Sequence, residues 1–165
     1  MKIRVGFVSN SSSSSFVAMG FKYNDSIKEL YNKLFGDDVD EYIEKEIKKL
    51  EEEIWDYSKE KAEKLKNKNE DEIIDVLFQR IYRYLEKEFG LNISFNEIED
   101  GFDGDGIYIY KDLFADEDLF IDEDETECGF NNLSLSEVVK PIEKIKEVLD
   151  KKDSETKIYS GLRMI

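Results

Sequence analysis

The chain has 165 residues and a formal net charge of −16, with 40% hydrophobic and 39% charged residues. This hydrophobic fraction is enough for a folded core, which excludes a wholly disordered chain, and no apolar run approaches the ~18 residues that a membrane-spanning helix needs. The complete absence of histidine excludes Ser-His-Asp and Cys-His nucleophilic sites and histidine-ligated zinc.

The length predicts a single domain, residues 1–165, with a division into 1–90 and 91–165 as the alternative.

Two strands are predicted at 3–9 and 16–23, because both segments are rich in Val and Phe and each contains a glycine that marks a bulge or a close approach. The serine run between them is predicted to be a polar hairpin loop. A modified tag, a phosphate-binding loop and a specific protein contact are the alternatives. The run consists of Ser11, Ser12, Ser13, Ser14 and Ser15.

The N-terminal string also carries a resemblance. The segment Lys2-Ile3-Arg4-Val5-Gly6-Phe7-Val8-Ser9-Asn10, with the serines that lead to Phe16-Val17, resembles the opening shared by many small uncharacterised proteins of bacteriophages and their low-GC hosts. This resemblance implies a phage or mobile-element origin and brings no catalytic residues with it.

Three helices are predicted after the second strand, since apolar residues recur there every three or four positions. They cover 26–35, from about 37 to about 66, and 70–89, with Gly36 and Gly90 ending the first and third. The second and third are expected to pack as an antiparallel hairpin along their apolar stripes. Trp55 is expected to be buried or half-buried on the second helix, with a role as a partner anchor as the alternative.

Beyond Gly90 the apolar period changes to two, which predicts strands around Ile93–Phe95 and Ile107–Leu113, joined by a hairpin loop, and another at 119–121. A last helix is predicted at 134–150, or from Pro141 if the proline occupies its first turn, followed by a strand at 156–163. This order predicts an α+β fold: a small antiparallel sheet with a long helical hairpin and a C-terminal helix.

Most of the negative charge lies in one stretch. Residues 97–127 contain fourteen acids and one base, Lys111, and therefore account for −13 of the −16. The charge excludes a simple nucleic-acid binder, which needs a basic surface. Three interpretations remain: a solvated acidic face, a mimic of nucleic-acid charge, and a divalent-metal site.

The leading hypothesis is mimicry by a non-enzymatic binding protein. Carboxylates spaced along strands can imitate the regular negative charge of a nucleic-acid backbone and occupy the basic surface of a nucleic-acid-binding protein. The hypothesis expects a phage-encoded inhibitor of a host defence protein, anti-CRISPR-like, that binds neither nucleic acid nor membranes. The expected partner-binding residues are Glu97, Glu99, Asp100, Asp103, Asp105, Asp112, Asp116, Glu117, Asp118, Asp122, Glu123 and Asp124.

The runner-up is a divalent-metal-dependent enzyme acting on a phosphate-containing substrate. Asp103, Asp105 and Asp112 are its candidate ligands, because Asp103-Gly104-Asp105-Gly106 matches part of a calcium loop. A virion or host-interaction accessory protein is the third possibility. No other cofactor is expected, and the oligomeric state stays open.

The single cysteine, Cys128, and an opening too short and too polar for a signal peptide predict a cytoplasmic location in the host cell.

Overall fold

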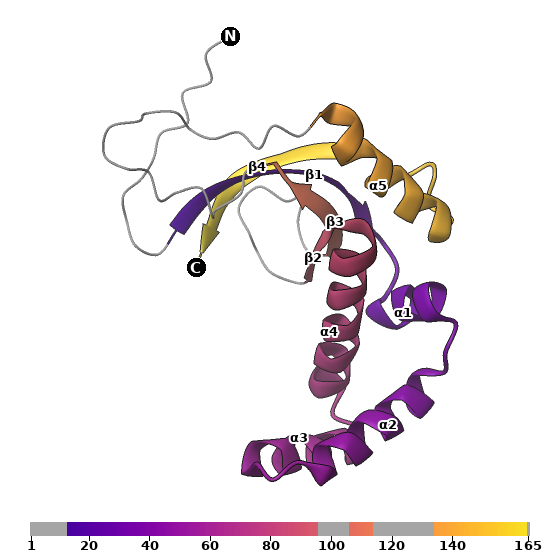
Figure 1. Cartoon of the computed structure of the whole chain (residues 1–165), viewed down its shortest axis with the longest axis vertical. Helices are drawn as coiled ribbons and strands as arrows, with labels where there is room; N and C mark the ends of the chain where they lie inside the picture. The colour runs from indigo at the N-terminus through magenta and orange to yellow at the C-terminus, as the bar shows by residue number, and fades with distance from the viewer. Residues whose placement is uncertain (1–12, 96–105, 114–133, 165) are drawn as a thin grey trace.

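The computed structural model describes residues 13–95, 106–113 and 134–164. These ranges form an α+β fold with five helices and a four-stranded antiparallel sheet, which confirms the predicted fold class (Figure 1). The helices are α1 (Ile27–Phe35), α2 (Val39–Glu52), α3 (Asp56–Lys66), α4 (Glu70–Phe89) and α5 (Leu135–Val148). The strands are β1 (Ser13–Tyr23), β2 (Asn92–Phe95), β3 (Ile107–Asp112) and β4 (Lys157–Met164).

The sheet has the order β2-β3-β1-β4, so the longest strand, β1, lies between β3 and β4. Phe21 pairs with Ile109, and Ile109 pairs with Ile93, which places these three side chains on one face. That face joins α1, α4 and α5 in the main hydrophobic core. Alternate residues form a second buried cluster: Ala18, Tyr108, Tyr110 and Tyr159.

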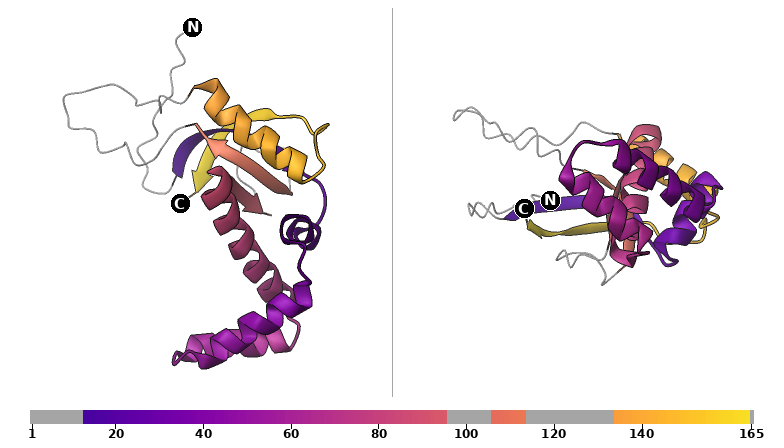
Figure 2. Two further views of the ribbon diagram at one scale, coloured as in Figure 1. Left: turned by 45° about the vertical axis from the view of Figure 1, so that its right-hand side comes forward. Right: turned by 90° about the horizontal axis from the view of Figure 1, so that it is seen from below.

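The long helix α4 runs away from the sheet, and α2 and α3 lie across its far end (Figures 1 and 2). We call α2 and α3 together the arm. The two predicted helix ends are confirmed: Gly36 and Gly90 end α1 and α4 in the left-handed conformation. At the start of α1, Ser26 forms a capping box with Glu29. These local signals fix where the helices begin and end.

The predicted helix from about 37 to 66 is wrong as a single element. Glu53 and Trp55 have extended backbones, and the chain turns there, so α3 folds back beside α2. A straight helix of this length would measure about 45 Å and leave its second half without a partner. The turn instead lets Ala62 and Leu65 become buried.

The predicted serine loop is also wrong for the part that the structure describes. Ser13, Ser14 and Ser15 belong to β1 and pair with Met164, Arg163 and Leu162 of β4. The ladder to a distant strand decides this conformation, because β-pairing satisfies the backbone whatever the side chain's turn preference. Ser11, Ser12 and the strand predicted at 3–9 lie outside the described residues, as does the strand predicted at 119–121.

Helix α5 contains Pro141 in its interior, so the alternative of a helix that starts at this proline is wrong. Ser134 caps the helix and forms a capping box with Glu137, so α5 starts at Leu135, six positions before the proline. The strand predicted at 156–163 is confirmed as β4.

Candidate functional site

Both parts of the acidic stretch attach to β3. Residues 96–105 connect β2 to the start of β3, where Phe95 pairs with Ile107. Residues 114–133 connect the other end of β3 to α5, and there the Leu113 N–H donates to the Val17 carbonyl at 2.8 Å. A strand rises about 3.3 Å per residue, so β3 separates the two attachment points by roughly 17–20 Å. The acids therefore leave the sheet from opposite ends of one strand.

Of the predicted partner-binding acids, Asp112 lies within the described ranges. It is half-buried at the end of β3, and the Asn92 Nδ2 donates to its Oδ2 at 3.0 Å. One carboxylate oxygen of Asp112 thus already has a partner within the sheet. The other predicted residues lie outside the described ranges: Glu97, Glu99, Asp100, Asp103, Asp105, Asp116, Glu117, Asp118, Asp122, Glu123 and Asp124.

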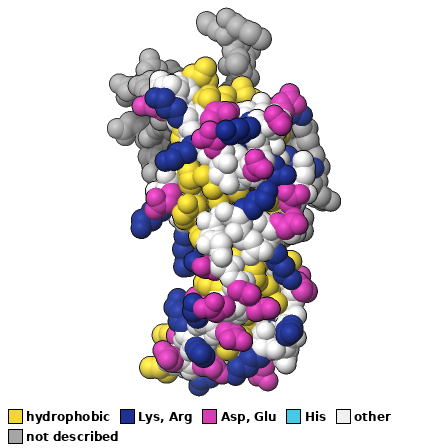
Figure 3. Space-filling model, turned by 90° about the vertical axis from the view of Figure 1, so that its right-hand side faces the viewer, with side chains coloured by type: hydrophobic (Ala, Val, Ile, Leu, Met, Phe, Trp, Pro, Cys, Tyr) yellow, Lys and Arg dark blue, Asp and Glu magenta, His cyan; other side chains and the backbone are white. Residues whose placement is uncertain are grey.

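The described body is close to electrically balanced, whereas the two segments are not. Residues 96–105 and 114–133 contain 13 acids and no Lys or Arg, while the described ranges contain 27 acids and 22 Lys or Arg. Ion pairs join the helices of the body, such as Lys61–Asp75 at 2.8 Å between α3 and α4. Figure 3 shows basic and acidic side chains interspersed over one face of this body. Most of the excess negative charge therefore belongs to the two segments.

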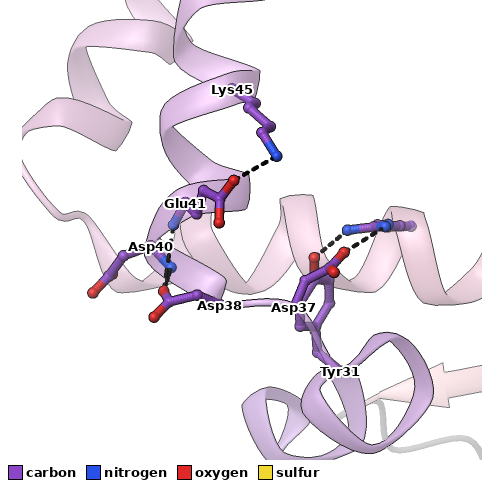
Figure 4. Close-up of polar contacts among 7 residues, drawn as sticks. Tyr31, Asp37, Asp38, Asp40, Glu41 and Lys45 are labelled. Carbon is purple, nitrogen blue, oxygen red and sulfur yellow. Dashed lines mark hydrogen bonds and ion pairs between the residues drawn. The ribbon is translucent and has the colours of Figure 1, made fainter.

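Arg80 of α4 holds the arm against α1. Its guanidinium lies 4.2 Å from the Phe35 ring centroid and 4.4 Å from that of Tyr42. It donates to the Tyr31 hydroxyl and pairs with Asp37 at 3.1 Å, and Figure 4 shows both contacts as dashed lines. These contacts come from α1, α2 and the connection between them, so Arg80 is a structural joint.

Trp55 lies at the turn between α2 and α3 and is 74% exposed. The expectation of a buried or half-buried position is therefore wrong. That expectation treated Trp55 as part of a continuous helix stripe, and the stripe ends where the chain turns. Ile54 and Tyr57 beside it are exposed as well.

The metal hypothesis has one candidate ligand, Asp112, in the part of the chain that the structure describes. No group of three or more potential ligands occurs among the described residues. Asp103 and Asp105 connect to the start of β3, and Asp112 occupies its end. None of the described helices is long and apolar enough to cross a membrane.

The comparisons with known proteins give no relative: no protein-family model, no curated protein and no solved structure matches this chain.

Proposed function

We propose that this chain is a non-enzymatic binding protein whose acidic segments occupy the basic surface of a nucleic-acid-binding protein. The observation that carries the proposal is the separation of charge. Thirteen carboxylates without a single Lys or Arg are attached to a body whose own charges nearly balance. A chain that is acidic for solubility alone would carry its excess over the whole surface.

The attachment of both segments to β3 supports this proposal. It allows negative charge to extend from both ends of a central strand, over a length comparable to several phosphates of a nucleic-acid backbone. Such a field attracts a basic partner at long range and raises the association rate, and salt screens this attraction.

The biological setting belongs to the same proposal. The resemblance of residues 2–17 to phage proteins supports a phage origin, and a phage protein that covers a basic nucleic-acid-binding surface would inhibit a host defence factor in an anti-CRISPR-like role. Inhibition requires no catalysis, because the bound carboxylates compete directly with nucleic acid for the same surface.

The test compares two variants with an equal change in net charge. One carries Asp100→Asn, Asp103→Asn, Asp105→Asn and Asp112→Asn. The control carries Glu44→Gln, Glu63→Gln, Glu86→Gln and Glu88→Gln, which are exposed acids of the helices. Proteins captured from host lysate by the natural chain are purified, and binding is measured over a salt series and in competition with DNA and RNA.

We expect nucleic acid to displace the natural chain. The Asp→Asn variant should bind at least tenfold more weakly, with a shallower salt dependence, and the Glu→Gln control should bind within threefold of the natural chain. Equal binding by the Asp→Asn variant, or binding that nucleic acid does not affect, would contradict the proposal.

A further inference from the structure

The turn between α2 and α3 exposes three large apolar side chains next to one another. Ile54 is 89% exposed, and Trp55 and Tyr57 are each 74% exposed. We call these three residues the aromatic tip. In the described ranges the other exposed large apolar side chains, Leu135, Val148 and Ile158, are spread over both ends of α5 and over β4. The aromatic tip is thus a concentrated feature at the end of the arm, far along α4 from the sheet (Figure 1).

The fold does not account for Trp55. It occupies the N-cap position of α3, and its side chain makes no capping hydrogen bond. Each of the other helices in the described ranges has a capping side chain that accepts from a backbone N–H. These are Ser26, Asp38, Asn69 and Ser134. A capping side chain contributes about 1 kcal/mol to helix stability. Helix α3 lacks this contribution, because its N-cap residue is Trp55, whose indole is exposed to water.

The arm presents the aromatic tip on a fixed support. The Ser58 hydroxyl donates to Glu53 across the turn, and Lys66 pairs with Glu51 between α3 and α2. Lys61 is paired with Asp75 of α4. A tip held by packed helices loses little conformational entropy when it enters a partner, which favours binding.

Acidic residues outnumber basic ones in the sequence around the aromatic tip. Residues 51–60 contain five acids, Glu51, Glu52, Glu53, Asp56 and Glu60, and one base, Lys59. Glu51 is paired with Lys66 and Glu60 with Lys64, so Glu52, Glu53 and Asp56 supply the excess negative charge beside the tip. This charge disfavours an anionic lipid surface and also a second copy of the same acidic tip. An apolar pocket rimmed by Lys or Arg would complement both the aromatic rings and the carboxylates.

We propose that the aromatic tip is a protein-docking surface, and that Trp55 enters an apolar pocket with a basic rim on the partner. Tryptophan and tyrosine are the side chains that most often dominate binding energy at the centre of an interface, and charges around the pocket set specificity. This surface is separate from the acidic segments, because substitutions in the aromatic tip leave all thirteen of their carboxylates in place.

The experiment uses the full chain, whose single tryptophan is Trp55. Proteins are captured from a lysate of the cells in which the chain is naturally produced, once with the natural chain and once with the variant Trp55→Ala, Tyr57→Ala. A protein retained by the first and lost by the second is purified, and its affinity is measured for Trp55→Ala, for Trp55→Phe and for the exposed control Leu135→Ala. Incorporated 5-fluorotryptophan gives one fluorine signal that reports whether Trp55 is shielded from solvent in the complex.

We expect Trp55→Ala to weaken binding at least tenfold, Trp55→Phe to retain part of the affinity, and Leu135→Ala to bind within threefold of the natural chain. The fluorine signal should lose its solvent-isotope shift on binding, and added Glu52→Gln and Asp56→Asn should weaken binding most at low salt.

Four outcomes would overturn the proposal. The first two are that no captured protein depends on the aromatic tip, and that Trp55 stays exposed in the complex. The other two are that Trp55 is shielded from solvent by self-association, seen by sedimentation velocity, or by anionic phosphatidylglycerol vesicles. If the Asp→Asn variant of the acidic segments loses affinity and Trp55→Ala also weakens binding as expected, the result supports both surfaces. The two proposals therefore fail separately.

Discussion

The guanidinium of Arg80 lies 4.2 Å from the centroid of the Phe35 ring, across 45 positions of sequence. It also contacts the ring of Tyr42 at the start of α2 and pairs with Asp37 in the connection between α1 and α2. One side chain of α4 therefore joins α1 to the arm. Lysine cannot reproduce this arrangement, because an ammonium neither stacks on rings nor presents a planar set of donors.

Replacement of Arg80 should loosen this joint. We expect Arg80→Ala to lower the free energy of unfolding by about 2–3 kcal/mol and Arg80→Lys by about half as much, since Tyr31 and Asp37 lose donors and the rings lose their stacked cation. Urea unfolding checks the values. The exposed Lys87→Ala on the same helix is the control and should change stability by less than ~0.5 kcal/mol; an Arg80→Lys variant as stable as the natural chain would contradict this role.

Gly20 is required by the closeness of β1 and β3, as the sequence predicts for a strand glycine. A Cβ at this position would lie 2.6 Å from the Cα of Tyr110. We therefore expect Gly20→Ala to destabilise the sheet by more than ~3 kcal/mol, because neither backbone can move without breaking the ladder. Gly36→Ala is the comparison, since that glycine has a φ of 66° and open space around it. It should cost only about 1 kcal/mol in thermal or urea unfolding, and equal losses at the two sites would refute the explanation.

Tyr23 should make the protein sensitive to alkali. Its burial, with the neighbouring carboxylates of Asp25 and Glu29, raises the pKa of Tyr23 from 10.0 to about 12. Between pH 10 and pH 12 the folded state keeps the Tyr23 hydroxyl proton, which the unfolded state has lost. The contribution of Tyr23 to the free energy of unfolding is therefore complete below pH 10 and is lost as the pH rises through 12. The loss should be on the order of 2 kcal/mol.

Tyr23→Phe isolates this effect. The buried Tyr23 hydroxyl has no hydrogen-bond partner of good geometry among the described residues, so its removal should leave stability at pH 7 unchanged or slightly raised. Urea unfolding between pH 9 and pH 12 should then show a smaller decline for Tyr23→Phe than for the natural chain. Parallel declines would show that other groups cause the alkaline loss.

Lys146 of α5 is buried and hydrogen-bonds the segment that connects α5 to β4. Its Nζ donates to the Ser154 carbonyl and to the Thr156 hydroxyl. We expect Lys146→Met to cost about 1–3 kcal/mol, because the two oxygens lose their donor in a partly buried place. Hydrogen exchange should accelerate in residues 150–156, and the exposed Lys140→Met should leave it unchanged; normal protection in Lys146→Met would count against this attachment.

Divalent cations distinguish the binding protein from the metal-dependent enzyme. If the acidic segments serve as a charged surface, Mg²⁺, Mn²⁺ and Ca²⁺ should raise the melting temperature to similar extents by screening. A ligated ion stabilises the folded state by mass action and would give a shift specific to one cation. A specific shift that disappears in Asp112→Asn would favour the metal site and contradict the charged-surface interpretation.

The candidate site could be located in sequence only in part. Counting charges identified residues 97–127 as the acidic stretch, because that property needs no structure. The Asn92 partner of Asp112 is twenty positions away, and the attachment of both acidic segments to β3 follows from strand pairing. The exposure of Trp55 was missed because the apolar period continues through Leu50 and Ile54 without a break. A capping side chain at the start of α3 would reveal the turn, but Trp55 occupies that position and makes no capping hydrogen bond, so this local signal is absent.

Local sequence patterns are enough to predict the α+β class and most helix ends, since capping by Ser26, Gly36, Gly90 and Ser134 depends on atoms within about four residues. Tertiary structure alone decided that Ser13–Ser15 extend β1, that α3 folds back on α2, and that Arg80 stacks on rings from two other elements. These features depend on which distant segment supplies the missing hydrogen bonds or the buried surface. Local propensity carries no information about such partners, and they override it wherever the two disagree.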